Sequence, residues 1–421
     1  MKKLLNLLLI FLIIGISCRK IENDTPNPVA IVKDSVGLSS NSLVNNDLSS
    51  LGNRITLIDD SAHTFIDTTS SGEKGITPKV LGVSSITIQL IAQLSPPKFN
   101  KEVLQASHIR IVTGYAYIAY NTQGPRYLGG VDIVNISTAT NPTLISNAVF
   151  NGKDVSSIDV EPKGTGNNNF VWIAAADSAL ATPAIVERYI LNSSNQFKAI
   201  NDPRQFYNLP GYVGTDVKFR DNKVYATSGT GGGLTVLNNG MNLINYYPLD
   251  NARSVDVNSQ YVIALGGNPG HLFNPGVWNK LIGGATDPEA KSMVRLYTNS
   301  AAKCNYNFAL AALGEDGLKC YNIASSTPET VVSSIPRPTI PTGGNSWDYV
   351  TNGVSISNGW VYIANGAGGL DIAKLNTTTG QLTWLGNINL GSSVNFVEAS
   401  SNYVFVATGL GGLKILKVTE N

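Results

Sequence analysis

Histidine and charge are scarce in this chain of 421 residues. Its three histidines stand at positions 63, 108 and 271, and charged residues make up 14% of the sequence. The 30 basic residues nearly balance the 29 acidic ones, so the basic excess that nucleic-acid binding requires is missing. So few histidines also argue against a multi-histidine metal site. We therefore expect no metal, no cofactor and no nucleic-acid partner.

The usual enzyme motifs are missing as well. The sequence has no Gly-x-Ser-x-Gly, no His-Glu-x-x-His, no Cys-x-x-Cys and no Walker loop. The glycine-rich segment Gly229–Gly233 indicates a turn between strands rather than a phosphate-binding loop. We assign no catalytic residue from the sequence.

Long apolar runs are also lacking, apart from one at the N-terminus. Leu4–Ile14 is apolar except for Asn6, and about 11 residues are too few to span a bilayer as a helix. With Lys2 and Lys3 in front of it, the run is typical of a secretory signal peptide.

A cysteine follows this run directly. Gly15-Ile16-Ser17-Cys18 resembles a bacterial lipobox, although Gly15 stands where that family usually has leucine. The resemblance implies a lipoprotein signal peptide over residues 1–17 and a lipid anchor, palmitate included, on Cys18. The alternative is an ordinary secretory peptide with an incidental cysteine.

The acidic residues after the cysteine bear on location. Glu22 and Asp24 are similar to the export signals of surface lipoproteins in some Gram-negative bacteria. We expect the protein to be anchored in the cell outer membrane and leave open whether it faces the periplasm or the surface. Residues 18–85 are rich in Ser, Asn, Asp, Thr and Gly, which predicts a flexible polar tether.

From residue 86 onward a repeat appears. Its unit is an aromatic or β-branched strand, a glycine-rich turn and another apolar strand, at spacings of about 38 to 55 residues. The last residues of the second strands form the column Ala119, Ala174, Thr227, Leu265, Ala312, Ala364 and Ala407. Four-stranded propeller blades have this size.

Third strands show a second regularity. Gly130–Asn135, Gly276–Ile282 and Gly317–Ile323 are each followed by a turn ending in proline, and we interpret each as a third strand. These segments resemble the LVIVD-repeat family of β-propellers in exported bacterial and archaeal proteins. The resemblance implies an all-β fold, a seven-bladed β-propeller of four-stranded blades over residues 86–421.

The two ends of the domain complement each other. The last copy ends at Val418 without a fourth strand, whereas Ile86–Leu94 alternates like a strand and precedes the first complete copy. A propeller must pair its terminal edges or expose them. We predict that this N-terminal strand closes the last blade.

The propeller also separates the two remaining cysteines. Cys304 is expected at the end of an innermost strand and Cys320 in the third strand of the same blade, about 9 to 10 Å away, two strand spacings. A disulfide needs about 4.4 to 6.8 Å between the Cα atoms. We predict two buried free thiols.

One position of the innermost strands carries charges whose sign alternates. It is occupied by Arg110, Asp159, Lys218, Asp256, Lys303, Ser355 and Glu398. We interpret this set as a structural belt, because neighbouring blades would bring opposite charges together in a partly buried ring. A charged catalytic ring is the alternative.

Two groups of residues are candidates for binding. Long loops are expected at 121–129, 201–212, 266–275 and 336–352, and their aromatic and basic residues favour a recognition surface. These residues are Arg126, Tyr127, Phe206, Tyr207, Tyr212, His271, Phe273, Trp347 and Tyr349. The alternative is that they pack on one another as loop cores.

At the channel mouth, His108, Asp216 and Arg253 could hold a polar group, although each is also typical of a satisfied structural residue.

Two functions remain. The first is a non-catalytic cell-envelope lipoprotein, a binding or scaffold module that presents a loop-rich face to a protein or glycan. The second is a hydrolase or lyase with its active site at the channel mouth. The missing motifs favour the first, and the sequence does not name the ligand.

Overall fold

The computed structural model describes residues 32–34, 42–67, 84–161, 169–198, 204–258, 261–266, 270–274, 277–282, 293–298, 307–323 and 331–421. Strands make up nearly all of its regular structure, with one short helix and two 3-10 turns. The expected signal segment and Cys18 lie outside these residues. No helix within them is long and apolar enough to cross a bilayer.

Four-stranded antiparallel sheets are the repeating unit. In the first, β8 (Gln105–Val112), β9 (Tyr115–Asn121), β10 (Leu128–Asn135) and β11 (Thr143–Asn151) pair in chain order. The β-branched and aromatic residues of β9 and β10 are buried almost throughout, as expected for strands covered on both faces.

The remaining sheets repeat this order, and each blade is named here by its innermost strand. They comprise β12 (Lys153–Glu161), β13 (Phe170–Asp177), β14 (Ala184–Ile190) and β15 (Arg204–Asn208); β16 (Gly214–Arg220), β17 (Lys223–Ser228), β18 (Gly233–Asn238) and β19 (Leu243–Pro248); β20 (Ser254–Val257), β21 (Val262–Leu265), β22 (Gly270–Asn274) and β23 (Val277–Ile282); β24 (Met293–Thr298), β25 (Asn307–Ala312), β26 (Leu318–Asn322) and β27 (Val331–Ile335); β28 (Gly353–Ser357), β29 (Trp360–Ala364), β30 (Leu370–Leu375) and β31 (Leu382–Ile388); and β32 (Phe396–Ser400), β33 (Tyr403–Ala407), β34 (Leu413–Glu420) and β5 (Ser84–Leu94).

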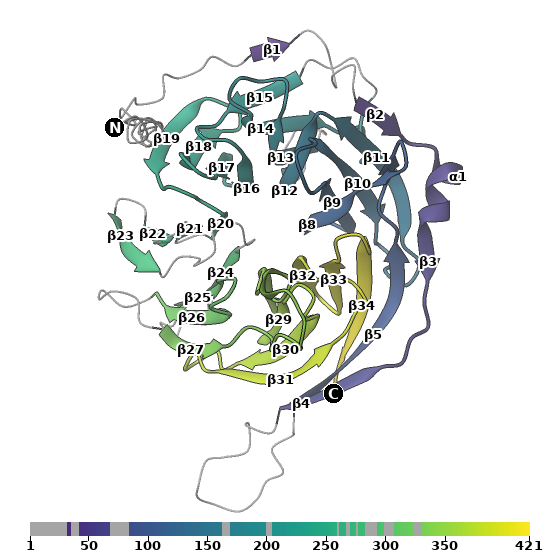
Figure 1. Cartoon of the computed structure of the whole chain (residues 1–421), viewed down its shortest axis with the longest axis vertical. Coiled ribbons are helices and arrows are strands. Elements are labelled where there is room, and N and C mark those ends of the chain that lie inside the picture. Colours follow the sequence, from purple (N-terminus) through teal and green to yellow (C-terminus); the bar gives the residue numbers. More distant parts are fainter. Residues whose placement is uncertain are drawn as a thin grey trace, which may run out of the picture.

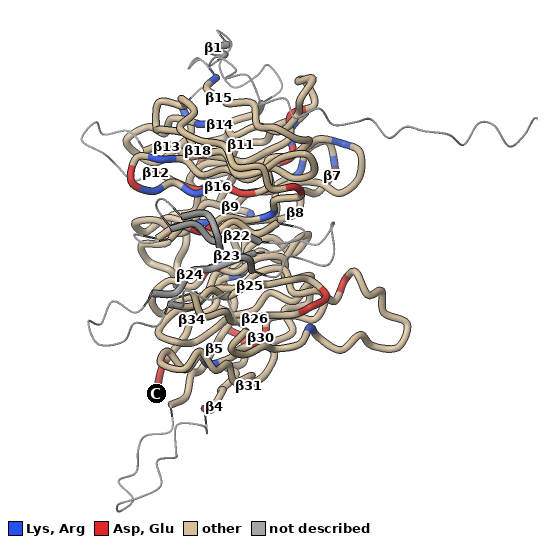
Figure 2. Tube along the Cα trace, turned by 90° about the vertical axis from the view of Figure 1, so that its left-hand side faces the viewer, with Lys and Arg blue, Asp and Glu red and all other residues tan. Residues whose placement is uncertain are grey.

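The sheets stand around a common centre (Figure 1). Each innermost strand contacts the next, from β8 through β12, β16, β20, β24 and β28 to β32, and β32 contacts β8. The chain is therefore an all-β β-propeller with four-stranded blades. Seen from the side, the hairpin of β6 (Lys98–Phe99) and β7 (Glu102–Val103) lies at one rim, and acidic and basic residues are intermingled along the chain (Figure 2).

The predicted closure by the N-terminal strand is confirmed. β5 pairs with β34 along nearly its whole length, from Leu94 opposite Leu413 to Ile86 opposite Glu420. Ile86 and Ile88 are fully buried, so the strand also contributes core. The N-terminal part of the domain thus supplies the outer strand of the last blade.

Part of the expected tether is folded against the ring. The segment contains β1 (Val32–Asp34), β2 (Ser42–Asn45), α1 (Leu48–Leu51), the 3-10 turn η1 (Gly52–Arg54), β3 (Ile55–Leu57) and β4 (His63–Asp67). β1 pairs with β15, β2 with β11, and both β3 and β4 with β5. Leu51 and Phe65 are buried. The expectation of a flexible tether is wrong for these residues, because they satisfy the outer edges of the sheets.

The prediction that Gly276–Ile282 is a third strand is wrong by one strand. Val277–Ile282, within the segment expected as a third strand, is the fourth strand, and the third is β22. Met293–Thr298 then becomes the innermost strand of the next blade. A five-residue strand among Gly, Asn and Pro is read as loop from composition, and this explains the shift.

Cys320 lies in a third strand, β26, as predicted. Its thiol is free and buried, and burial raises its pKa to about 12. The thiol therefore stays protonated and packs as a small apolar group. Cys304 lies outside the described residues.

Candidate functional site

Strand register brings one position of each innermost strand to the same level of the channel. The residues at this level are Arg110, Asp159, Lys218, Asp256, Ser355 and Glu398. Each lies opposite the residue two positions before the column Ala119, Ala174, Thr227, Leu265, Ala364 and Ala407. In the β24 blade the equivalent residue is Arg295, opposite Leu310. The prediction of Lys303 is wrong, because it lies beyond β24 and outside the described residues. Arg295 preserves the alternation of sign.

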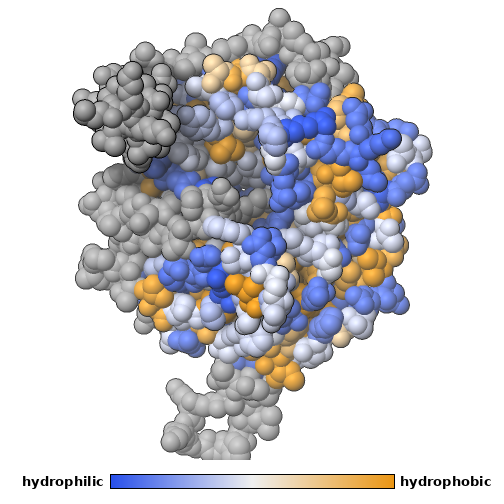
Figure 3. Space-filling view, in the orientation of Figure 1, coloured by the Kyte–Doolittle hydropathy of each residue, from blue (hydrophilic) through white to orange (hydrophobic). Residues whose placement is uncertain are grey.

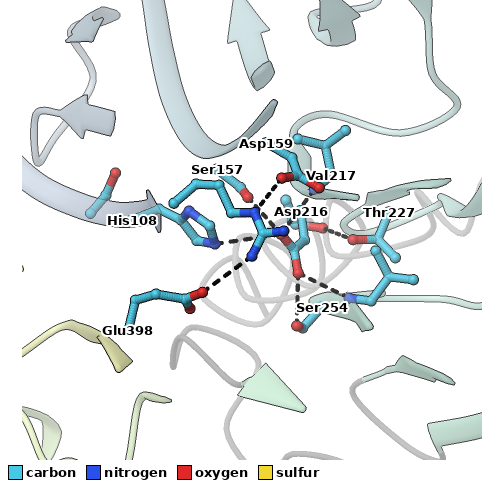
Figure 4. A network of polar contacts seen from close by, with 12 residues as sticks. His108, Ser157, Asp159, Asp216, Val217, Thr227, Ser254 and Glu398 are labelled. Carbon is cyan, nitrogen blue, oxygen red and sulfur yellow. Dashed lines mark hydrogen bonds and ion pairs between the residues drawn. The ribbon is translucent and has the colours of Figure 1, made fainter. Parts of the chain in front are cut away.

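Arg110 joins three blades in the channel through Asp159 and Glu398, which are labelled in Figure 4. Its Nε donates to Asp159 Oδ1 of β12 at 2.6 Å and its Nη1 donates to Glu398 Oε1 of β32 at 3.2 Å. The Asp159 carboxylate raises the pKa of Arg110, and burial opposes this effect. These are the opposite-sign contacts between neighbouring blades that the alternation predicts.

Asp159 also bonds to the next blade, the β16 blade. Its Oδ2 accepts from the backbone N–H of Phe219 in β16 at 2.7 Å, and its Oδ1 accepts from Val160 N–H at 2.8 Å. The carboxylate is almost completely buried. Its hydrogen bonds and the ion pair offset the cost of burying its charge.

A second polar group lies two residues earlier in these strands. Asp216 Oδ1 accepts from Ser157 Oγ at 2.5 Å, and its Oδ2 accepts from Ser254 Oγ at 2.8 Å. Backbone N–H groups of Val217 and Val255 complete the carboxylate's shell. Asp216 therefore ties β12, β16 and β20 together.

His108 approaches this group from β8. Its Nε2 lies 3.8 Å from Asp216 Oδ1, and its ring centre lies 3.9 Å from that of Phe396. The structure thus brings together two of the three residues expected at the channel mouth. The third, Arg253, immediately precedes β20, where its N–H donates to Leu265 O.

The group does not have the order of a nucleophilic triad. Such a triad needs a serine hydroxyl bonded to an imidazole, with the carboxylate behind the imidazole. Here Ser157 and Ser254 donate to the carboxylate itself. This arrangement holds the charge of Asp216 in place and orients strands, rather than activating a hydroxyl.

Four of the expected loop residues lie in strands. Phe206 and Tyr207 are buried in β15, where Arg204 stacks on the Phe206 ring. His271 and Phe273 belong to β22, opposite Ala264 and Val262. Both strands are short and lie in segments rich in Pro, Asn or Gly, a composition typical of loops. The prediction that these four residues lie in loops is wrong, and burial of Phe206 and Tyr207 removes these two from the expected binding face.

The other five residues lie on connections at one rim of the ring. Tyr212 and Trp347 are 71% and 58% exposed, whereas Tyr127 and Tyr349 are half-buried. Arg126 pairs with Glu102 and lies 5.7 Å above the Phe99 ring, which ties it to the β6–β7 hairpin. This contact accords with the alternative of loop packing.

Sequence reasoning missed an apolar residue on the same rim. Leu410, in the β33–β34 turn, is 62% exposed. Second-to-third strand turns and connections between blades lie at the same end of the sheets, because strand directions alternate. The only signal in the sequence for the exposure of Leu410 is its position between Gly409 and Gly411. The loop-rich face is defined here by Tyr212, Trp347 and Leu410.

The visible surface is mixed in character. In Figure 3, hydrophobic residues form separate small patches among hydrophilic ones, and hydrophilic residues border the centre of the ring. Among the described residues, no group of three His, Cys, Asp or Glu side chains is placed to hold a metal ion.

Comparison with solved structures shows the fold. The WD40 repeats of RRP9 align with a TM-score of 0.54 at 11% identity, covering 77% of this chain and 97% of that one. A catalytically inactive variant of virginiamycin B lyase from Staphylococcus aureus with quinupristin aligns at 0.51 and 12% identity, covering 79% and 99%. The WD40 β-propeller domain of Doa1 aligns at 0.51 and 12%, covering 78% and 97%.

The curated proteins gave no significant match. The LVIVD repeat model matches residues 105–149 and 350–373, which cover β8 to most of β11 in one blade and β28 to most of β30 in another. The expected resemblance is therefore found, and this chain is a β-propeller protein that carries LVIVD repeats.

Proposed function

We propose that this chain is a non-catalytic cell-envelope lipoprotein whose propeller binds a protein or glycan partner through its loop-rich face. The exposure of Tyr212, Trp347 and Leu410 on one rim carries the proposal. Large apolar side chains on connections give contact area at low entropy cost. A rigid ring beneath them holds the contacts in place.

We further propose that the ring has seven blades. Seven sheets of four or more strands support this count, as does the closed circuit of contacts among their innermost strands. A rigid closed ring suits a scaffold, because its loops are held at fixed separations.

The state of the channel polar groups favours binding over catalysis. Asp159 and Asp216 are held by backbone N–H groups, and Arg110 is held between two carboxylates. A hydrolase or lyase at the channel mouth is the alternative and would need an acid or base with a proton to exchange. Similarity to the lyase at 12% identity bears on fold alone.

Membrane attachment and location rest on the N-terminal sequence. The apolar run ending at Cys18 supports lipidation, and Glu22 and Asp24 support export to the cell outer membrane. A membrane anchor would place the propeller next to envelope partners.

The partner can be found and then used to test the face. Mild isolation of the protein from its native membrane should yield a co-purifying protein or glycan. Replacing Tyr212, Trp347 and Leu410 together by Ala should then weaken binding of that purified partner by at least about tenfold. The melting temperature should change little, because exposed side chains contribute little core.

A matched control is the replacement of exposed Ile244 in β19 and Ile66 in β4 by Ala, which removes apolar area away from these connections. This variant should bind normally. Unchanged affinity in the triple variant would refute the loop-rich face as the binding surface. Turnover of a purified envelope substrate would favour the enzyme alternative.

A further inference from the structure

Two blades carry the same Asp–Asn pair at the same register, with the aspartate buried in both. In β10, Asp132 faces Asn147 of β11, and in β30, Asp371 faces Asn387 of β31. In both blades the asparagine Nδ2 donates to the aspartate Oδ1 at 2.7 Å. The two aspartates are therefore equivalent positions of the repeat, and their surroundings can be compared directly.

In the β8 blade this position is occupied by an arginine of the N-terminal segment. Arg54 places both terminal nitrogens on the carboxylate of Asp132, with Nη1 at 2.9 Å from Oδ1. Its Nε and Nη2 donate to Ser95 O at 2.9 and 2.8 Å. The guanidinium of Arg54 thus donates to two acceptors, the Asp132 carboxylate and the carbonyl of Ser95, which follows the outer strand of the preceding blade.

In the β28 blade the same position opens onto a hollow of about 470 Å³ lined by Asp371, Asn387 and Pro336. Pro336 follows β27 as Ser95 follows β5, since Ile335 and Leu94 pair with equivalent leucines. Pro336 keeps the carbonyl but lacks the N–H with which Ser95 bonds Arg54 O.

Asp371 has no basic partner among the described residues, in contrast to Asp132. Arg337 lines the same hollow, but its Nη1 is directed to Glu315 at 3.1 Å. Burial raises the pKa of Asp371, and hydrogen bonds from Asn387, Trp384 and Asn365 oppose the rise. A cation entering the hollow would supply the positively charged partner that the Asp371 carboxylate lacks among the described residues.

The neighbouring side chain is covered in one blade and exposed in the other, as far as the described residues show. Leu144 in β11 is fully buried, and α1 and η1 contact that strand. Its equivalent in the β28 blade is Trp384, which lines the hollow and is 53% exposed. Trp is the aromatic side chain that best binds a cation on its face. In the described residues no strand pairs with the outer edge of β27, whereas β3 covers β5.

We propose that the hollow between β27 and β31 binds an arginine side chain of a partner polypeptide, presented by an extended segment along β27. Asp371 and the Pro336 carbonyl receive the guanidinium as Asp132 and Ser95 receive Arg54. Trp384 covers its face. This surface is separate from the loop-rich face and adds a second, peptide-reading site to the propeller.

The chain itself supplies the probe for a test. A fluorescent peptide with the sequence of residues 50–58, which contains Arg54, is titrated with the full chain and followed by fluorescence anisotropy. Asp371→Asn should weaken binding by at least about tenfold, because a bidentate charged contact becomes neutral. Trp384→Ala, at an exposed position that leaves the fold intact, should also weaken it.

Two controls distinguish a general effect of charge from binding at this hollow. Asp348→Asn removes the same charge from an exposed position on the preceding connection and should change affinity less than about twofold. A peptide with Arg54→Lys should bind more weakly than the arginine form, since lysine cannot form the planar fork.

Two results would overturn the proposal. One is the absence of binding by the arginine peptide. The other is binding that neither Asp371→Asn nor Trp384→Ala weakens, which would mean that the peptide exchanges with the chain's own segment at Asp132. The triple variant of the loop-rich face should bind the peptide normally, so failure of either site is distinguishable from failure of the other.

Discussion

Arg110 joins three blades at the channel, as Asp216 does. Its guanidinium bonds to carboxylates of the β12 and β32 blades, so one side chain of β8 holds three blades at the channel. The side chain of Asp159 is 1% exposed, so its charge depends on protein partners rather than water.

We expect Arg110→Met to lower the free energy of unfolding by about 3 kcal/mol, because it removes the cation that bonds both Asp159 and Glu398. Urea denaturation of the full chain measures this. Arg220→Met is the matched control, since Arg220 pairs with exposed Asp221 at 3.4 Å, and such a pair contributes less than about 1 kcal/mol. Equal losses in the two variants would contradict a special role for Arg110.

At the scale of elements, β5 lies between two sets of strands. It pairs with β34 on one edge and with β3 and β4 on the other. The strand is therefore interior, although its sequence position is N-terminal to every blade. Its removal would expose an apolar edge of the last blade.

Truncation from the N-terminal side should reveal this in steps. Of the described elements, deleting residues 19–41 removes β1 alone, and it should alter the melting temperature little. Deleting residues 19–80 also removes Leu51, Phe65 and the partner of buried Asp132, at a cost of about 3 kcal/mol or more. Deleting residues 19–95 removes β5 as well, and the protein should aggregate or lose cooperative unfolding. Three equal melting temperatures would contradict this order.

Sequence reasoning succeeded where a pattern recurs and failed where it does not. The alternation of Ile86–Leu94 and the missing fourth strand after Val418 together predicted closure. The contact between Arg54 and Asp132 joins residues 78 positions apart and leaves no local period to detect. His271 was misplaced because β22 has only five residues, too few to stand out against Gly, Asn and Pro.

The charge belt contains both residues that the sequence predicted correctly and one that it predicted wrongly. Alternation of sign located the level of the ring correctly for Arg110, Asp159 and Glu398, which do pair. At the remaining position Lys303 is predicted and Arg295 is found, and both are basic, so alternation of sign alone does not separate them. Only strand register, with Arg295 opposite Leu310, distinguishes the two.

For the whole molecule, the proposed anchor sets where the propeller operates. Replacing Cys18 with Ala should move the protein from the washed membrane fraction to the soluble fraction, because the acyl chains that hold it would be absent. Immunoblotting of both fractions measures this, with Cys320→Ala as a control that leaves Cys18 intact. Retention of the Cys18 variant on washed membranes would refute lipidation there.

The pairing of β5 with β34 also sets the order in which the molecule can be completed. During synthesis β5 emerges before the blades, whereas β34 emerges after the other blades have been made. β3 and β4 precede β5 and can pair with one edge of this 11-residue strand, but its other edge must wait unpaired for β34. Joining such distant segments is slow, and an exposed strand edge invites aggregation meanwhile. The arrival of β34 thus decides when the last blade can be completed, and any delay in it lengthens the time during which the edge of β5 is exposed.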